Sequence, residues 1–301
     1  GKTMKKVLFA TTALVATAGV AAADIDLTGG AIAGLIYDGT GDAFLHYEID
    51  LNVVASGATD NGLSFGASLD LDLDDEGADG NNSANELNDP EIFIGGAFGT
   101  LTFGELDPMI DNVGVADVGF DGVGVDNDVE DLRFAADPDG DGEGIAAGDS
   151  NVTYVYENAG FTVGVSAFVG ETNGDDLNEG NYGVLLGYSM DGLSVNIAYD
   201  YNDQADTSAT ALGLGYSVDA ISVAATFVDG HNGDTGYGLS GSYTMDALTV
   251  TAVFADTDAA GDEADFGVGA VYDLGGGLAV AGGVGDVNDE TVWDLGLTMS
   301  F

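Results

Sequence analysis

Apolar and polar residues alternate along almost the whole chain after residue 23. In residues 63–73, for example, every odd position is apolar and every even position is small or acidic. A period of two is typical of β-strands, and many of these segments approach the 9–11 residues with which a tilted strand crosses a bilayer. The pattern predicts sixteen strands, at 25–37, 45–53, 63–73, 92–98, 101–105, 152–156, 161–169, 182–190, 193–201, 210–218, 221–227, 237–245, 248–254, 266–274, 278–284 and 293–301.

The connections between these segments alternate in length. Tight turns such as Asp191-Gly192 and Asp219-Ala220 alternate with longer loops rich in Asp, Gly and Asn, of which 106–150 is the longest and the third along the chain. Such alternation is typical of an antiparallel meander whose two rims face different compartments. The prolines (Pro90, Pro108 and Pro138) are expected outside the strands or at their edges, because proline cannot donate a ladder hydrogen bond.

The two faces of the predicted strands differ in chemistry. One face gathers aromatic residues near the strand ends, as the interfacial girdles of a lipid-facing band do. The other face carries ionisable residues that lipid would not tolerate, and a sixteen-stranded barrel is wide enough to keep them in water. We therefore expect the following acids to line a water-filled channel: Asp26, Glu48, Asp50, Asp70, Asp72, Glu91, Asp200 and Asp294.

Composition narrows the choice of function. The chain has 53 Asp+Glu against 4 Lys+Arg and no cysteine, with a formal net charge of −49. Phosphate recognition needs clustered basic residues, so nucleic acid is excluded as a partner, and thiol chemistry is excluded as well. The mean hydropathy of +0.15 is too high for a disordered acidic chain.

The first 23 residues are predicted to be a secretory signal peptide. A basic start at Met4-Lys5-Lys6 precedes an apolar run, and Ala21-Ala22-Ala23 supplies the small residues of a cleavage site. Residues 1–3 are interpreted as a fragment upstream of the true start. The exported chain would then be residues 24–301, a single barrel domain with 106–150 as its constriction loop.

Four motifs resemble one known family. They are 61–67 (NGLSFGA), 94–105 (IGGAFGTLTFGE), 272–277 (YDLGGG) and the C-terminal 293–301 (WDLGLTMSF). Together they look like the α-proteobacterial general porins of the Rhodobacter type, over the whole chain. The resemblance implies a homotrimer of sixteen-stranded barrels in the outer membrane of a Gram-negative cell. It also implies a third loop folded into the lumen, recognition of Phe301 by the barrel-assembly machinery, and passage of small hydrophilic solutes.

The third loop is therefore the candidate constriction. Its expected pore-facing residues are Asp107, Asp111, Asp117, Asp121, Asp126, Asp128, Glu130, Asp131 and Arg133. A ring of carboxylates concentrates cations and repels anions, whereas the alternative is a solvated loop on the outer surface. The family pattern places basic residues opposite the loop, but here no strand carries one. Arg133 either faces the pore or pairs internally with Glu130 or Asp131. We predict cation selectivity.

A second part of the loop resembles a cation site. Asp137, Asp139, Asp141 and Glu143 offer oxygen ligands at every second position, although Gly148 stands where an EF-hand needs Glu. Ca²⁺ binding and diffuse association of Na⁺ or Mg²⁺ are both left open, and no cofactor is required. The excess of acidic residues has two interpretations: it makes the pore selective for cations, or it is an adaptation of the protein to a saline habitat.

The sequence contains no recognisable catalytic motif. His46 and His231 lie in no recognisable nucleophile or metal motif, and the glycine-rich stretches are turns, so no catalytic residue is assigned. The alternative function is a secreted, acidic, Ca²⁺-binding adhesin or surface protein built from soluble β-sandwiches.

Overall fold

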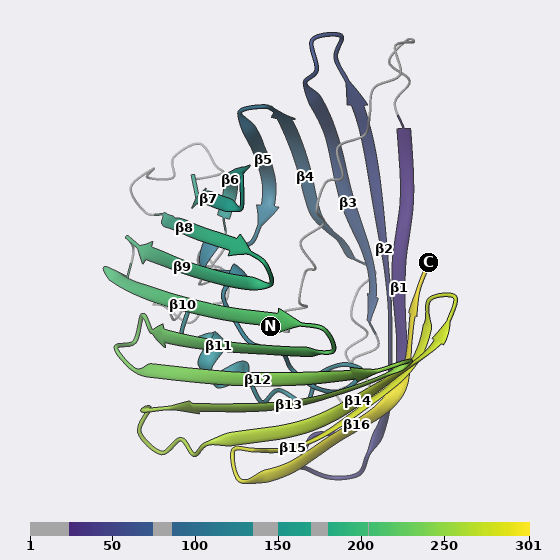
Figure 1. Ribbon diagram of the computed structural model, residues 1–301. Helices are drawn as coiled ribbons and strands as arrows, with labels where there is room; N and C mark the ends of the chain where they lie inside the picture. Colours follow the sequence, from purple (N-terminus) through teal and green to yellow (C-terminus); the bar gives the residue numbers. More distant parts are fainter. Residues whose placement is uncertain (1–23, 75–85, 135–149, 170–179, 204) are drawn as a thin grey trace.

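The computed structural model describes residues 24–74, 86–134, 150–169, 180–203 and 205–301, which form one closed antiparallel barrel of sixteen strands (Figure 1). The sequence-based prediction of an all-β barrel is confirmed, and the alternative of β-sandwiches is not favoured. The strands are β1 (Asp24–Tyr37), β2 (Phe44–Ala58), β3 (Ser64–Asp74), β4 (Glu86–Gly96), β5 (Gly99–Leu106), β6 (Ser150–Asn158), β7 (Phe161–Ala167), β8 (Asn181–Met190), β9 (Leu193–Asn202), β10 (Thr207–Val218), β11 (Ile221–Asp229), β12 (Thr235–Met245), β13 (Leu248–Thr257), β14 (Asp265–Gly275), β15 (Leu278–Val287) and β16 (Glu290–Ser300).

Tight turns join the strands along one rim. Asp191 and Gly192 both have positive φ, 49° and 83°, which is the geometry of a two-residue hairpin turn whose twist matches the flanking strands. Asp219 and Asp246 take the same left-handed position in their own turns, both with φ 51°. Short acidic side chains tolerate this conformation better than bulky ones, which explains the recurrence of Asp at these turns.

The two ends of the chain close the barrel. β16 pairs antiparallel with β1, from Gly30 opposite Ser300 to Tyr37 opposite Trp293. Beyond this register the backbone N–H of Gly29 donates to the carbonyl of Phe301 (2.8 Å), and the N–H of Phe301 donates back (3.0 Å). Closure removes the free strand edges, which is the condition for spanning lipid with a sheet.

The outer face of the barrel is apolar. Large hydrophobic side chains are exposed along β1, β7 and β8, for example Ile25 (69% exposed), Phe161 and Leu186. A surface of this kind is expected to contact lipid rather than water. No helix in the described part of the chain is long and apolar enough to cross a membrane.

The position of Pro90 differs from the expectation. β4 begins at Glu86 rather than at residue 92, so Pro90 lies within a strand. The strand tolerates Pro90 because neither neighbouring strand pairs with this residue. The β3–β4 ladder passes from Ser68 opposite Glu91 to Asp70 opposite Asn88, and the β4–β5 ladder ends at Glu91. Proline is confined to such irregular or unpaired positions of a sheet.

Candidate functional site

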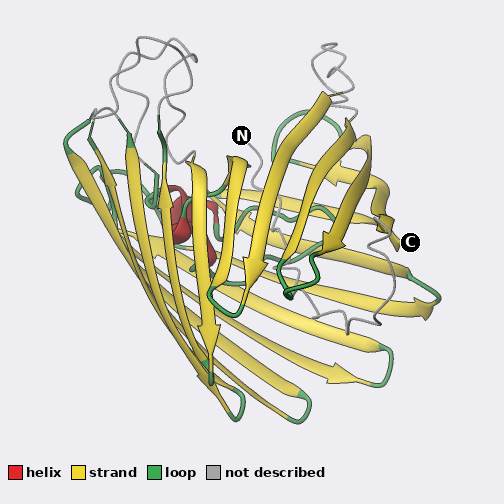
Figure 2. Ribbon diagram, turned by 90° about the horizontal axis from the view of Figure 1, so that it is seen from above, coloured by secondary structure: helices red, strands yellow, loops and turns green. Residues whose placement is uncertain are grey.

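The connection between β5 and β6 enters the barrel. Its described part, residues 107–134, contains a 3₁₀ turn, η1 (Met109–Asn112), and one short helix, α1 (Asn127–Asp131). η1 contacts β7, β8 and β9, whereas α1 contacts β11, β12 and β13. Figure 2 shows both elements within the ring of strands. The predicted inward fold of the third loop is therefore confirmed.

The loop packs on a part of the inner wall that is built from glycine and other small residues. A β-carbon at Gly238 of β12 would lie 2.8 Å from Val115, and one at Gly269 of β14 would lie 2.7 Å from Val118. Larger residues would leave no room for the loop. The main buried apolar cluster of the described residues accordingly lies between loop and wall, and its loop members are Met109, Ile110, Val113, Val115, Val118, Val125, Val129 and Leu132.

The glycine wall gives a direct test of loop packing. In Gly269→Ala the new methyl group would lie 2.7 Å from the Val118 β-carbon and 3.1 Å from the Gly119 nitrogen, so the loop must move. We expect a destabilisation of about 1–3 kcal/mol, the usual cost of overpacking, seen as a lower melting temperature in detergent. Gly30→Ala on the inner face of β1 is the matched control, because its nearest neighbour lies at 3.4 Å. Equal melting temperatures for the two variants would contradict this packing.

Arg133 lies inside the loop and does not face the pore. Its side chain is 2% exposed, and its guanidinium pairs with Asp111 (Nη2 to Oδ1, 3.0 Å) and with Glu130 (Nη2 to Oε2, 2.9 Å). It also donates to the backbone carbonyls of Asp111 (3.2 Å), Val113 (2.5 Å) and Glu130 (2.9 Å). The internal pairing with Glu130 matches one of the two interpretations of the sequence. Asp111, not Asp131, is the second partner.

Asp294 of β16 binds the loop backbone from the wall. Its Oδ2 accepts hydrogen bonds from the backbone N–H groups of Phe120 (2.8 Å) and Asp121 (3.1 Å). Its Oδ1 accepts one from Gly283 of the neighbouring strand β15 (2.7 Å). This predicted pore-lining acid therefore holds the loop in place, because hydrogen bonds to a charged acceptor are stronger than neutral ones.

Two further acidic residues of the loop, Asp117 and Asp126, lie against other parts of the loop itself. Asp117 accepts hydrogen bonds from the backbone N–H groups of Val118 (2.7 Å) and Gly124 (2.9 Å), so its carboxylate closes a turn of the loop. Asp126 directly precedes α1 and is only 2% exposed. Asp117 therefore has a structural role within the loop, and a pore-facing role of Asp117 or Asp126 remains a prediction.

The remaining loop acids are more accessible. Asp107 and Asp131 are exposed, whereas Asp128 is half-buried on α1. Burial raises the pKa of Asp128, and the negative charges of Asp262 and Asp131 act in the same direction. This carboxyl group therefore retains a proton at higher pH than an ordinary aspartate does.

An acidic wall stands on the inner face of β2, β3 and β4. Asp50 lies directly opposite Asp72 in the β2–β3 ladder, and Asn52, which lies opposite Asp70, donates to its carboxylate. Glu91 of β4 lies opposite Ser68, whose hydroxyl donates to it (3.3 Å). Directly opposite residues of antiparallel strands share one face of the sheet, so these carboxylates are brought together. With Glu48 on the same face, they form what we call the acidic wall, which comprises Glu48, Asp50, Asp70, Asp72 and Glu91.

Asp26 and Asp200 lie away from the acidic wall. Asp26 is exposed near the start of β1. Asp200 is buried on β9 and pairs with His231, whose Nε2 lies 3.2 Å from its Oδ2. The other ring nitrogen of His231 lies 2.9 Å from the Thr207 hydroxyl, so both nitrogens of this imidazole are engaged. This pair was not predictable from the sequence, because Asp200 lies on β9 and His231 lies in the connection between β11 and β12.

Some sequence-based predictions concern residues outside the described part of the chain. The signal peptide at 1–23 is one of them, and the candidate Ca²⁺ ligands Asp137, Asp139, Asp141 and Glu143 are another. Both remain predictions.

A closed barrel with an apolar outer face, an acidic inner wall and a loop folded inside it defines a transmembrane β-barrel channel. The family model of Gram-negative porins matches residues 10–291 of the chain. The protein belongs to this family, and such porins form channels in the outer membrane.

Individual relatives agree with this assignment. The chain is 28% identical to a porin of Rhodobacter capsulatus over 92% of its own length and 100% of that protein. It is 27% identical to a porin of Fuscovulum blasticum, over 87% of this chain and 93% of that one. Among solved structures, a mutant of Rh. blastica porin superposes with a TM-score of 0.75 at 23% identity, covering 92% of this chain and 100% of that chain. The expected resemblance to Rhodobacter-type porins is confirmed.

Proposed function

We propose that this porin is a general-diffusion channel that prefers cations and admits small hydrophilic solutes. The mechanism is passive. A hydrated solute passes where the loop narrows the lumen, provided that it fits and that its charge suits the local field. The proposal includes no catalytic step.

The acidic wall is the observation that carries this proposal. Its five carboxylates lie on the inner face of neighbouring strands. The part of the loop that the structure describes packs against β7 to β16 and β1, and it meets β2 where Asp121 lies beside His46. After residue 6 the chain contains a single Lys or Arg, and that residue, Arg133, is buried among its own loop partners. A lumen with fixed negative charge and no opposing cationic wall raises the local concentration of cations and lowers that of anions.

The proposal extends to assembly and export. The resemblance to Rhodobacter-type porins implies a homotrimer and recognition of the C-terminal Phe301 by the barrel-assembly machinery. Phe301 is exposed on the outer face at the seam between β1 and β16, in agreement with a role as a contact residue.

Current through a planar lipid bilayer tests the channel and the trimer together. Detergent-purified protein is expected to insert in steps of equal conductance that close in groups of three, and neutral sugars are expected to swell liposomes that contain it. Single, ungrouped steps would contradict the trimer. Absence of conductance from protein that retains its β-sheet circular dichroism would contradict the channel itself.

A further inference from the structure

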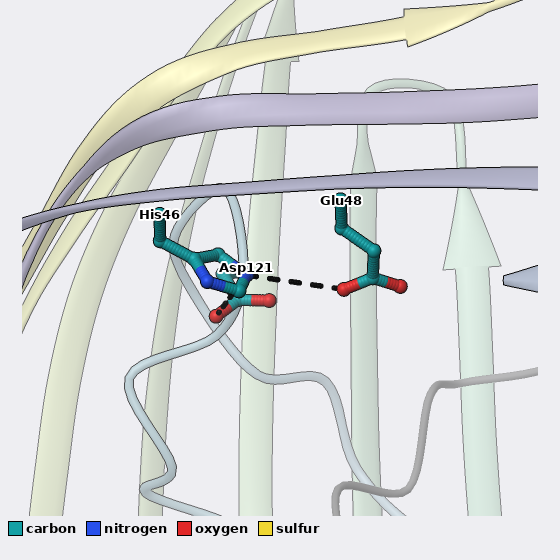
Figure 3. A group of neighbouring side chains, drawn as sticks. All are labelled: His46, Glu48 and Asp121. Carbon is teal, nitrogen blue, oxygen red and sulfur yellow. Dashed lines mark ion pairs between the residues drawn. The ribbon is translucent and has the colours of Figure 1, made fainter. Parts of the chain in front are cut away.

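A histidine and two carboxylates meet where the loop reaches the wall. His46 and Glu48 come from β2, and Asp121 comes from the loop, far from both along the chain. Figure 3 shows the three side chains near one another, with a dashed line from the imidazole of His46 to each of the two carboxylates. One ligand atom of each residue lies within 4.8 Å of the others, and His46 is 1% exposed.

The distances fit a metal ion better than hydrogen bonds. His46 Nε2 lies 3.5 Å from Asp121 Oδ2 and 3.9 Å from Glu48 Oε2. Both separations exceed the roughly 2.7–3.2 Å of an N–H···O bond, and a single Nε2–H points at one acceptor only. Two ligands each about 2.1 Å from a tetrahedral zinc ion lie about 3.4 Å apart. Two of the three separations are therefore close to the edge of a tetrahedral site. The third, between the carboxylates of Glu48 and Asp121, is within 4.8 Å, so the ligands close around the ion when it binds.

The charge of the cluster also favours a bound cation. Glu48 and Asp121 bring two carboxylates to a largely buried position, and burial of like charges is costly without a compensating positive charge. A divalent ion would neutralise both carboxylates at once.

The ligands are positioned by groups that surround them. Asp294 accepts the backbone N–H of Asp121, which fixes the loop at the residue that supplies the third ligand. Phe120 lies beside the imidazole, with ring centroids 6.5 Å apart, and limits the rotation of His46. Ligands held in place before the ion arrives lose little conformational entropy on binding.

We propose that His46, Glu48 and Asp121 bind a divalent transition-metal ion of the Zn²⁺ type and thereby join the constriction loop to the barrel wall. One nitrogen and two oxygen ligands suit Zn²⁺, whereas Mg²⁺ and Ca²⁺ prefer ligand sets made of oxygen alone. Three protein ligands leave a fourth position for water or a solute from the lumen. The bound ion would add positive charge beside the acidic wall, so occupancy lowers cation conductance.

Zinc titration of the full-length, detergent-purified porin by isothermal calorimetry tests the site. An excess of Mg²⁺ saturates diffuse carboxylate binding. We expect one Zn²⁺ per chain, with affinity reduced by more than about 100-fold in His46→Gln, which removes a direct ligand. Asp121→Asn is expected to weaken binding as well. A β-sheet circular dichroism spectrum and a melting temperature in detergent equal to those of the unaltered protein would show that each variant is folded.

His231→Gln is the matched control, because both nitrogens of that buried imidazole are engaged by Asp200 and Thr207. This variant is expected to bind zinc as the unaltered protein does. The proposal is wrong if no saturable zinc site exists in the presence of Mg²⁺, if His46→Gln retains full affinity, or if the loss occurs in His231→Gln instead. None of these outcomes depends on the ion selectivity of the channel, so the two proposals fail separately.

Discussion

Neutralising three carboxylates of the acidic wall is expected to lower the K⁺ over Cl⁻ permeability ratio by about fivefold or more. In water a carboxylate 4 Å from the path of a cation stabilises it by about 1 kcal/mol, which is about a fivefold change in its occupancy. Asp50→Asn/Asp70→Asn/Asp72→Asn replaces three such carboxyl groups at neighbouring positions on β2 and β3 with neutral amides. Zero-current potentials across a KCl gradient measure the ratio, and low salt enlarges the difference because screening is weaker.

The control removes the same charge from the rim. Asp191, Asp219 and Asp246 occupy left-handed positions in tight turns, a conformation that Asn adopts readily. Asp191→Asn/Asp219→Asn/Asp246→Asn is therefore expected to preserve the fold and to alter the permeability ratio much less. An equal change in both triple variants would show that selectivity follows total charge rather than the acidic wall.

Removing the charge of Arg133 is expected to release the loop. In Arg133→Met the carboxylates of Asp111 and Glu130 lose their buried partner, and the carbonyl of Val113 loses a donor. Breaking a buried ion pair from one side costs about 3–5 kcal/mol, enough to undock a loop of this size. We expect a larger and noisier single-channel conductance, with rapid proteolytic cleavage within residues 107–134.

Asp131→Asn is the comparison variant for this experiment. Asp131 is the last residue of α1 and lies two residues before Arg133, but it is exposed. Its neutralisation is expected to leave the resistance of the loop to proteolysis unchanged. If Arg133→Met remains as resistant as Asp131→Asn, the buried pairs do not hold the loop.

The strands were predictable because a membrane barrel has one lipid-facing side along every strand. Alternation in 63–73 matches β3, and the turn at Asp191-Gly192 appears in the structure as predicted. The boundary of β4 was missed because Pro90 normally ends a strand, and sequence alone does not reveal a neighbouring irregularity in the ladder that tolerates it.

The site was predictable only in part. The resemblance to Rhodobacter-type porins implied that the third long loop, 106–150, enters the lumen. An internal ion pair of Arg133 with Glu130 or Asp131 was one of two interpretations of the sequence. The small residues beneath the loop carry no hydropathy signal, so the packing of Val118 on Gly269 was not visible. Contacts between distant segments, such as Asp121 with His46, depend on barrel closure and loop path together.

The zero-current potential of the unaltered protein across a KCl gradient tests the central claim most directly. If the acidic wall governs permeation, K⁺ flows ahead of Cl⁻ from the concentrated side, and the dilute side becomes positive. A dilute side that becomes negative would mean anion selectivity and would contradict the account of the lumen given above.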